Sequence, residues 1–254
     1  MKFQQHYSSS KGNLYEVTAE NGARLLIEAG VPWEKLQEAL KYDLKGIEGC
    51  LLSHYHNDHC KAFKKVMQQG VNVYSSLGTW EALSRYEGEY KHWRKANVLG
   101  DGIFHVGSFN VLPFEVQHDV PCLGFVIREK ATDEYLLFVT DFFCLEQDWT
   151  ELYQEDTGQH KKGEPIWPFS IVALACSYDT EILQRLVDDQ AIDEALAKRL
   201  LFSHPSKQWL LNYLRNHVNL SKCREIHLLH CSAGNLDREA TCKEFESELF
   251  IEVL

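Results

Sequence analysis

Three histidines and an aspartate crowd into six consecutive positions directly after an apolar run. The stretch LLSHYHNDHCKA, residues 51–62, contains His54, His56, Asp58 and His59. Imidazole nitrogens suit zinc and related divalent ions, and a carboxylate adds charge neutralisation. Four such groups this close together would repel one another's lone pairs without a cation. We therefore interpret the stretch as a metal-binding cluster rather than a polar loop that happens to be rich in histidine.

The spacing of these residues divides them into two pairs. Side chains at i and i+2 point the same way from an extended strand end, so His54 and His56 can reach one ion. Asp58 and His59 follow in the next turn, where they can reach a second ion. The surrounding sequence reads as a strand, a tight connection and then a helix.

Strand-like and helix-like patterns alternate along the rest of the chain. The strand-like runs are NLYEVTA, ARLLIEAG, GCLLSH, VNVYSS, FHVGSFNVLPFEVQ, LGFVIRE, YLLFVTD, SIVALAC and EIHLLH. The helix-like runs are PWEKLQEALKY, KAFKKVMQQG, GTWEALSRYEGE, TEILQRLVDDQ, AIDEALAKRL, KQWLLNYLRNHV and LDREATCKEFESEL. Hairpin-like neighbours also occur, so we predict an α/β fold: an αββα sandwich of two mixed β-sheets with helices on the outer faces. We expect residues 1–254 to form a single domain, with an irregular inserted loop around 142–170 that is either a lid or a plain surface excursion.

The sequence HYHNDH resembles the HxHxDH signature of the metallo-β-lactamase superfamily, whose fold is the αββα sandwich. Members of this family hold two ions with seven protein ligands, so the resemblance implies three further ligands at strand ends. His118, Asp141 and His230 follow the runs FNVLPFEVQ, YLLFVT and EIHLL. Carried over one at a time, the first ion would take His54, His56 and His118, and the second would take Asp58, His59 and His230, with Asp141 bridging both.

Each added ligand has an ordinary alternative. A lone histidine at a strand end is more often a structural or exposed side chain, and Asp141 has the alternative of a turn or helix cap. His227 competes with His230 on the same strand. Alternation with period two places these two histidines on opposite faces, and His230 is nearer the strand end, so we prefer it.

The resemblance extends to a DNA-exonuclease-like, single-domain branch of the family. The stretch YSSSKGNLYEV, residues 7–17, resembles the Ser-Ser-x-Gly-Asn turn of that branch. It forms either a hairpin turn alone or a pocket wall made by its hydroxyls and the Gly12 amide. The branch follows this turn with a strand ending in Asp-Ala-Gly, where this chain has Glu28. FSHPS, residues 202–206, resembles its Gly-His-x-Ser element, which nominates His204 to meet the substrate phosphate; a helix-capping or surface histidine is the alternative.

Two departures weaken the transfer of a nuclease function. Ser203 and Pro205 flank His204, where the branch has glycine before the histidine. The branch's Glu-x-Asn-x-Asp element appears here as ACSYD, residues 175–179, which keeps only Asp179.

The implied chemistry is metal-dependent hydrolysis. Two divalent ions about 3.5–4 Å apart share a bridging hydroxide, and zinc in an open site lowers the pKa of bound water to about 7. Asp58 and Asp141 would hold this nucleophile, while His204 would donate to a phosphate oxygen or to the leaving group. Asp119 is either a partner that orients His118 or a turn residue.

The donor set favours zinc, with manganese as the alternative, because it mixes imidazole and carboxylate without thiolate. Cys60 follows His59 directly, but we expect it to pack on the helix. The family members that hydrolyse β-lactams with a cysteine ligand carry it on a later strand, where this chain has Asp141. Antibiotic hydrolysis is therefore disfavoured.

From these features we predict a metal-dependent phosphodiesterase that acts on nucleic acid in the manner of an exonuclease. The alternatives are a phosphodiesterase for small cyclic nucleotides and, less favoured, a non-catalytic metal-binding module. KHWRKANV, residues 91–98, is the one compact basic-aromatic patch, and is either a nucleic-acid contact or a solvated helix face. The net charge of −11 argues against a large non-specific nucleic-acid surface.

The composition places the chain among ordinary globular proteins, at 44% hydrophobic and 25% charged residues. No apolar run approaches the roughly 20 residues of a membrane span, and MKFQQHYSSSKGN lacks the apolar core of a signal peptide. The eight cysteines include no CxxC pair, so buried free thiols in a reducing compartment are expected. We predict a cytoplasmic protein without membrane contact, and a homodimer is left open.

Overall fold

The computed structural model describes residues 1–150, 167–232 and 234–254. The chain divides into two compact units, Met1–Asp133 and Glu134–Leu254. The single domain expected over residues 1–254 stays a prediction. Most of the loop predicted around residues 142–170 lies outside the described residues, and its final positions begin a strand instead.

The strands fall into two mixed β-sheets, which confirms the predicted α/β class. The first sheet lies entirely in the first unit and is ordered β1-β2-β3-β4-β5-β6. Its strands are β1 (Lys2–Ser9), β2 (Gly12–Thr18), β3 (Arg24–Ile27), β4 (Ile47–Leu51), β5 (Val73–Ser76) and β6 (Ala96–Leu99). The first three are antiparallel neighbours, and β3 to β6 are parallel. The carboxyl ends of β3, β4 and β5 therefore lie along one edge of the sheet, where ligand sites of parallel sheets form.

The first unit also supplies three strands of the second sheet. These are β7 (Phe104–Val106), β8 (Phe109–Val116) and β9 (Cys122–Glu129), which form an antiparallel meander. The meander is tied to the first sheet by the amide of Leu123, which donates to the carbonyl of Ser53 over 3.1 Å. At the other end, the amino terminus of Met1 lies 2.9 Å from the buried Glu129 carboxylate.

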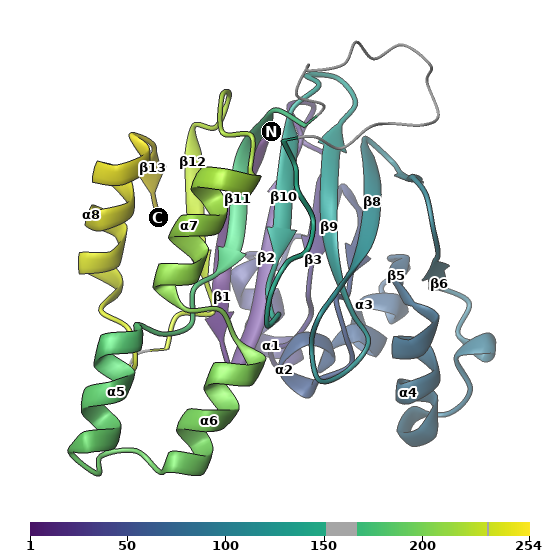
Figure 1. Ribbon diagram of the computed structural model, residues 1–254. Helices are drawn as coiled ribbons and strands as arrows, with labels where there is room; N and C mark the ends of the chain where they lie inside the picture. Colours follow the sequence, from purple (N-terminus) through teal and green to yellow (C-terminus); the bar gives the residue numbers. More distant parts are fainter. Residues whose placement is uncertain (151–166, 233) are drawn as a thin grey trace. The chain divides into compact units, whose positions relative to one another are not determined.

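Five short helices accompany the first sheet. They are α1 (Trp33–Ala39), α2 (Asn57–Cys60), α3 (Phe63–Gln68), α4 (Leu77–Glu87) and the 3-10 helix η1 (Tyr90–His92). Buried side chains of β3 to β5, among them Leu26, Cys50 and Val73, pack in one cluster with Leu36 of α1 and Phe63 of α3. Figure 1 shows α4 and the segment leading to β6 at the right-hand edge of this unit. Helices α1, α3 and α4 pack on the sheet through buried apolar side chains such as Leu36, Phe63 and Trp80.

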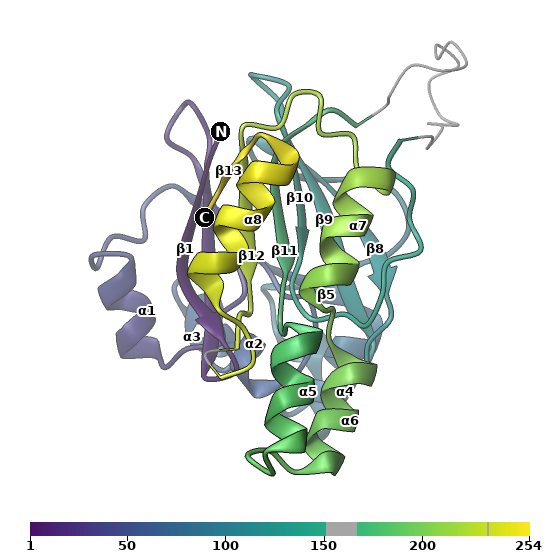
Figure 2. The same ribbon diagram turned by 60° about the vertical axis from the view of Figure 1, so that its left-hand side comes forward.

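The second unit contributes four parallel strands to the second sheet. They are β10 (Tyr135–Val139), β11 (Phe169–Ala175), β12 (Glu225–Leu229) and β13 (Glu252–Val253), paired in that order. Its helices are α5 (Thr180–Asp188), α6 (Glu194–Ser203), α7 (Lys207–His217) and α8 (Arg238–Leu249). Figure 2 shows α5 and α6 as a pair, which shares a small apolar cluster that includes Leu183 and Ala197. β11 is buried along its whole length, as expected for a central parallel strand.

The sequence pattern missed β1, which lies outside the predicted strand-like runs, and it was wrong in two further places within the first unit. The run FHVGSFNVLPFEVQ is two strands, because Gly107, with φ of 54°, turns the chain between β7 and β8. KHWRKANV is not a helix face, since only its first two residues fall in η1 and Ala96–Leu99 form the edge strand β6. Arg94 and Lys95 directly precede β6, and the alternation of apolar and polar residues within its four positions is too short to stand out beside them.

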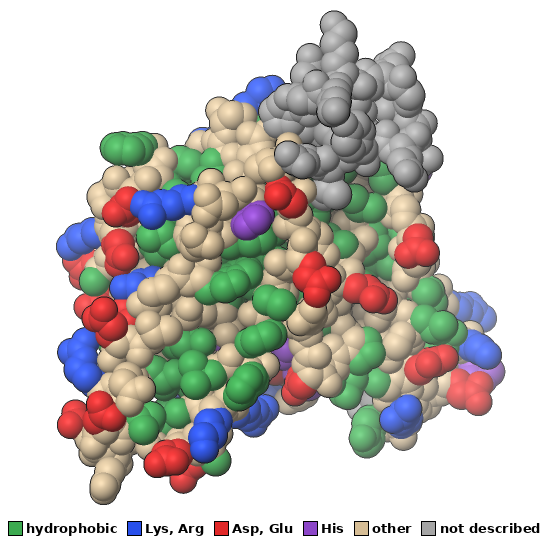
Figure 3. All heavy atoms as spheres, viewed as in Figure 1, with side chains coloured by type: hydrophobic (Ala, Val, Ile, Leu, Met, Phe, Trp, Pro, Cys, Tyr) green, Lys and Arg blue, Asp and Glu red, His purple; other side chains and the backbone are tan. Residues whose placement is uncertain are grey.

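The surface carries both signs of charge. Figure 3 shows acidic and basic side chains interspersed over the visible face rather than collected in one field. Among the described residues, no helix is long and apolar enough to cross a membrane.

Glu16 forms a buried ion-pair cluster on the first sheet. Its carboxylate accepts from Arg24 Nε over 2.7 Å and lies 3.0 Å from His6 Nε2. Burial alone would raise the pKa of Glu16, but the hydrogen bonds and charges of His6 and Arg24 outweigh it and lower the pKa to about 2. A carboxyl group with a lowered pKa stabilises the fold above its unfolded-state pKa, and this stabilisation is lost as the pH falls toward 2.

We predict that Glu16→Gln lowers the free energy of unfolding by about 3 kcal/mol at pH 6, since each unit of pKa shift corresponds to about 1.4 kcal/mol. Urea unfolding of both proteins at pH 6, 4 and 2.5 tests this. The difference between the two proteins should shrink steadily below pH 4.5. A difference that stays constant across this range would contradict the assigned role of the carboxylate.

Candidate metal centre

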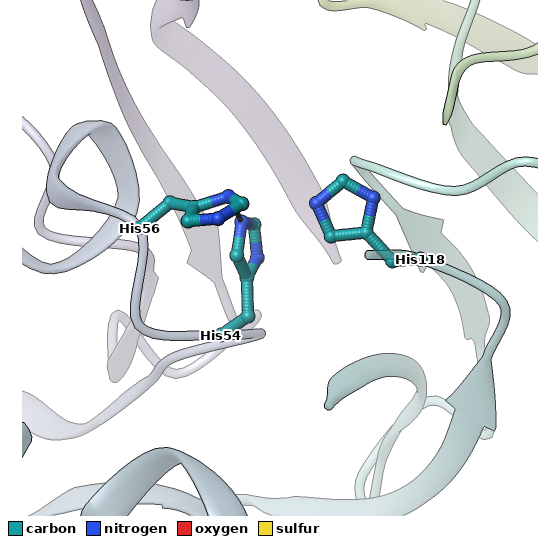
Figure 4. Close-up of side chains that lie close together, drawn as sticks. All are labelled: His54, His56 and His118. Carbon is teal, nitrogen blue, oxygen red and sulfur yellow. Dashed lines mark hydrogen bonds between the residues drawn. The ribbon is translucent and has the colours of Figure 1, made fainter. Parts of the chain in front are cut away.

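Three imidazoles converge in the first unit. The side chains of His54, His56 and His118 each offer a ring nitrogen, and these nitrogens lie within 4.8 Å of one another. His54 Nε2 is 3.0 Å from His56 Nδ1. Figure 4 shows His54 and His56 rising from one loop and His118 approaching from another, with the three rings facing a common point.

Two strand ends bring these rings together. His54 and His56 follow β4 directly, and His118 lies in the short loop between β8 and β9. Pairing of Val116 with Cys122 closes that loop. Its far end is tied to the β4 end, because Cys122 Sγ lies 3.6 Å from His54 Nδ1.

The arrangement fits a divalent ion. Zinc–nitrogen distances of about 2.0–2.1 Å and tetrahedral angles place two ligand nitrogens about 3.3 Å apart. The 3.0 Å between His54 and His56 is close to this value. Ser53 Oγ lies 2.8 Å from His54 Nδ1 and can accept a hydrogen bond from a protonated Nδ1, which would leave Nε2 to bind an ion. His118 is buried, and its Nε2 lies 2.9 Å from the exposed Asp119 carboxylate.

Asp58 and His59 sit on α2, immediately beyond the first pair of histidines. His59 is fully buried, whereas about a quarter of the Asp58 side chain is exposed. Asp58 Oδ2 is 3.4 Å from His59 Nε2. Asn13, at the start of β2, places its Nδ2 3.1 Å from the same ring nitrogen and donates to the Asp58 carbonyl. These contacts direct the Asp58 carboxylate and His59 Nε2 toward one point.

Glu28 contacts His59 on the Nδ1 side of its ring, opposite the Nε2 atom. It follows β3, is fully buried, and lies 3.5 Å from His59 Nδ1. Burial raises the pKa of Glu28, while the neighbouring His59 and the Ser53 amide act in the opposite direction. A carboxylate behind the distal nitrogen fixes the ring orientation and strengthens the imidazole as a ligand.

Gly30 allows the chain after β3 to approach α2. A Cβ atom at this position would lie 1.6 Å from the carbonyl oxygen of Asp58. The approach is held by hydrogen bonds from Ala29 N to His59 O and from Ala62 N to Ala29 O. Only glycine permits this contact without moving the backbone that carries Asp58 and His59.

The second unit holds its own pair of candidate ligands at parallel strand ends. Asp141 follows β10 and His230 follows β12, and both are largely buried. His230 Nε2 lies 3.5 Å from Asp141 Oδ1. His230 has a φ of 52°, a conformation that few non-glycine residues adopt. The His204 ring stacks on His230 with centroids 5.4 Å apart, so the structure brings this predicted residue to the same strand end.

Three other residues that the sequence offered for the site have different partners in the structure. His227 lies within β12, where its Nε2 is 3.6 Å from Glu225. Cys60 is buried on α2, where its thiol donates to the Tyr55 carbonyl over 3.2 Å. Asp179 of the ACSYD stretch caps α5 and pairs with Lys207 at 2.6 Å, which is a structural role.

Comparison with known proteins agrees with this geometry. Residues 23–157, more than half of the chain, match the family model described as a β-lactamase superfamily domain. The chain belongs to the β-lactamase superfamily. A curated relative, exodeoxyribonuclease YycJ of Bacillus anthracis, is 27% identical over 116 residues. That alignment covers 44% of this chain and 44% of the relative.

Solved structures share the fold over nearly the whole chain. The metallo-β-lactamase fold protein YhfI of Bacillus subtilis aligns with a TM-score of 0.67 at 14% identity, covering 99% of this chain and 94% of that one. Unliganded yeast PDE1 gives a TM-score of 0.63 at 12% identity, with coverage of 99% and 95%. The predicted metallo-β-lactamase fold is thus confirmed. Together with the His/Asp clusters, family membership supports a metal-dependent hydrolase.

Sequence reasoning missed the groups that support the ligands. Asn13 lies in the SSSKGN turn, where the pattern points to the hydroxyls and the Gly12 amide instead. Glu28 replaces the aspartate of the exonuclease-like pattern, and the replacement alone indicates no role. Ser53 directly precedes the HxHxDH stretch, and Gly30 is the glycine of the stretch that resembles Asp-Ala-Gly, so their positions were the available signal.

We predict that Gly30→Ala lowers the affinity for zinc at least tenfold, because support for ligands of this kind is typically worth about 10–100-fold. Competition with a chromophoric chelator measures this affinity. Gly100→Ala is the matched control, since nothing lies within 4 Å of a Cβ built there. Equal affinities in the two variants would show that the close approach does not position the ligands.

Proposed function

We propose that the chain is a dinuclear metal-dependent phosphodiesterase that hydrolyses nucleic acid as an exonuclease. The observation that carries the proposal is the convergence of the three imidazoles of His54, His56 and His118. The similarity to a protein named as an exodeoxyribonuclease supports the nucleic-acid substrate.

The proposed assignment uses seven ligands. His54, His56 and His118 would hold the first ion, and Asp58, His59 and His230 would hold the second, with Asp141 contributing to both. The Asp141–His230 pair supports this assignment because it offers an oxygen and a nitrogen from the ends of β10 and β12, which flank β11 in the sheet. Imidazole and carboxylate donors favour zinc, with manganese as the alternative.

The bound ions would supply an activated water and neutralise charge developing on the phosphate. Asp58 is the more exposed member of its pair, so its carboxylate can hold the attacking water and accept its proton. The attack forms a bond from the water oxygen to phosphorus and breaks the bond to the leaving oxygen. Asn13 and Glu28 hold the His59 ring in place during this step.

His204 would complete the reaction. Its ring stacks on His230, beside the proposed ligands of the second unit. In its protonated form, His204 can donate a hydrogen bond to a phosphate oxygen or give its proton to the leaving oxygen. Ser203 and Pro205 flank it, where the exonuclease-like pattern has glycine before the histidine.

A small cyclic nucleotide is the second candidate substrate. The net charge of −11 and the ACSYD stretch, which lacks the acid and amide of the exonuclease-like pattern, favour it. A small substrate needs no extended basic surface.

We predict that His118→Ala reduces bound zinc from about two equivalents to about one, because the first ion loses one of three protein ligands. Elemental analysis after dialysis against limiting zinc measures this. His105→Ala, an exposed histidine of the same unit, should keep both equivalents. Full zinc content in the His118 variant would remove this residue from the site.

We predict that Asp58→Ala lowers the turnover of bis(p-nitrophenyl) phosphate on the order of 100-fold or more, since it removes the proposed proton acceptor. Asp101→Asn is the control, because Asp101 is exposed in a loop of the same unit. The same proteins are then assayed on single- and double-stranded DNA, RNA and cyclic nucleotides. Turnover of cyclic nucleotides alone would replace the nucleic-acid proposal, and full activity of the Asp58 variant would contradict the site.

A further inference from the structure

Basic residues are concentrated in two short stretches of the first unit. KAFKK, residues 61–65, and KHWRK, residues 91–95, contain six of the 26 Lys and Arg residues in ten positions, and no acid. This is a strong local excess in a chain of net charge −11. In Figure 3, basic side chains lie at the right-hand edge over the segment between α4 and β6, together with acidic side chains and a histidine.

A pocket of about 290 Å³ lies between these stretches. Its lining residues are Lys64, Met67, Gln68, Trp93, Arg94 and Lys95. The lining therefore combines three cations, one large aromatic ring, one amide and one thioether, without a carboxylate. Lys64 Nζ stands 5.0 Å from the centroid of the Trp93 ring, in cation–π geometry.

The wall that carries Trp93 is fixed in place. The ring lies 5.4 Å from Phe63 and 6.0 Å from Trp80, so it packs against the core. The carbonyl of Lys95 accepts from Val73 N over 2.8 Å and from Asn97 Nδ2 over 2.9 Å. The aromatic surface is thus presented without the entropy cost of ordering a free loop.

A nucleotide unit matches this chemistry better than other anions. Its phosphate suits the guanidinium and ammonium groups, and its base can stack on an indole or pack beside it. Inorganic phosphate would leave the aromatic ring unused. An acidic peptide would use the cations, but it would place a flat ring against Trp93 only where it carries an aromatic residue.

The pocket also lies close to the proposed metal ligands along the chain. Lys64 is five residues after His59, so their Cα atoms are at most about 18 Å apart at full extension. Helical segments between them shorten this distance further. A strand of a few nucleotides can therefore span from one to the other.

We propose that this pocket binds one nucleotide unit of a single-stranded nucleic acid, at a distance from the reacting phosphodiester. The inference rests on the proposed phosphodiesterase function and deepens it, because it selects a strand over a small cyclic nucleotide. Lys64, Arg94 and Lys95 hold the backbone phosphates, and Trp93 contacts a base. Neither contact reads sequence, so binding tolerates different bases.

The test measures binding of fluorescein-labelled dT15 and rU15 by anisotropy, in an Asp58→Ala background that slows turnover during the measurement. The combined variant Lys64→Gln, Arg94→Gln, Lys95→Gln should lose at least tenfold in affinity. Its slope of log K against log salt should fall by about 2, because each phosphate contact to a single strand contributes about 0.7. Lys35→Gln, an exposed lysine on α1, is the matched control and should change affinity less than twofold.

Trp93 is tested separately. Trp93→Leu should weaken dT15 binding at least fivefold, while Trp93→Phe keeps a ring and should lose less. Because Trp93 packs on the core, the charge variant carries the decision if the leucine variant does not fold. A charge variant with the affinity and salt slope of the Lys35 control would overturn the proposal. Equally tight binding of dTMP, inorganic phosphate or poly-glutamate would also overturn it.

The two proposals fail in different ways. Turnover of bis(p-nitrophenyl) phosphate by the charge variant, with Asp58 intact, should equal that of the parent protein, because this small ester does not need the pocket. If the parent shows no such turnover, the phosphodiesterase function fails. Loss of oligonucleotide binding in the charge variant would then still identify the pocket as a strand-binding site.

Discussion

The close approach of the chain after β3 to helix α2 governs the geometry of the first unit's site. Ile27 pairs with Leu51 in parallel register, so the ends of β3 and β4 lie side by side. The chain beyond β3 then places Glu28 behind His59, and Gly30 lets the two backbones touch. A fully buried carboxylate beside a fully buried imidazole is stable only when each compensates the other's desolvation. The ligand-bearing helix is therefore fixed by the register of the sheet rather than by its own four residues.

Strand pairing also positions His118, the third of the converging histidines. The loop that carries His118 is closed by the pairing of β8 with β9, and Leu123 connects it to the carbonyl of Ser53. Ser53 also contacts the ring of His54, so one residue links the two loops that carry the three converging histidines. Supporting groups of this kind restrict the rotation of each imidazole ring before an ion binds. The affinity for the ion rises, because less conformational entropy is lost on binding. In the second unit, His230 adopts a backbone conformation of positive φ instead. Such conformations cost free energy and persist where the surroundings enforce them.

The sequence was sufficient for the fold class and for most strands, because alternation and apolar runs report burial directly. The HxHxDH stretch was informative because its four candidate ligands lie within six consecutive positions of the chain. The supporting contacts are not local: Asn13 meets His59 across 46 positions of the chain, and Glu28 meets Ser53 across 25. Such contacts depend on strand register, which no single segment encodes. β6 was missed for a related reason, since an edge strand of four residues gives too short a pattern beside the basic stretch that precedes it.

The acidity of the chain constrains how it can bind an anionic polymer. Two divalent ions would change the net charge from −11 to −7, because they add four positive charges. The chain would still repel a nucleic acid at long range. At physiological ionic strength, however, charges are screened beyond about 8 Å, so the groups near each phosphate decide its bound-state energy. Under the proposed function, the net charge would slow association, whereas the ions and the Lys64, Arg94 and Lys95 cluster would act on the bound strand. A strand that contacts both the metal centre and this cluster would therefore bind better than a small anion that contacts only one of them. Once the strand is held at one site, its contact with the other is made at high effective concentration.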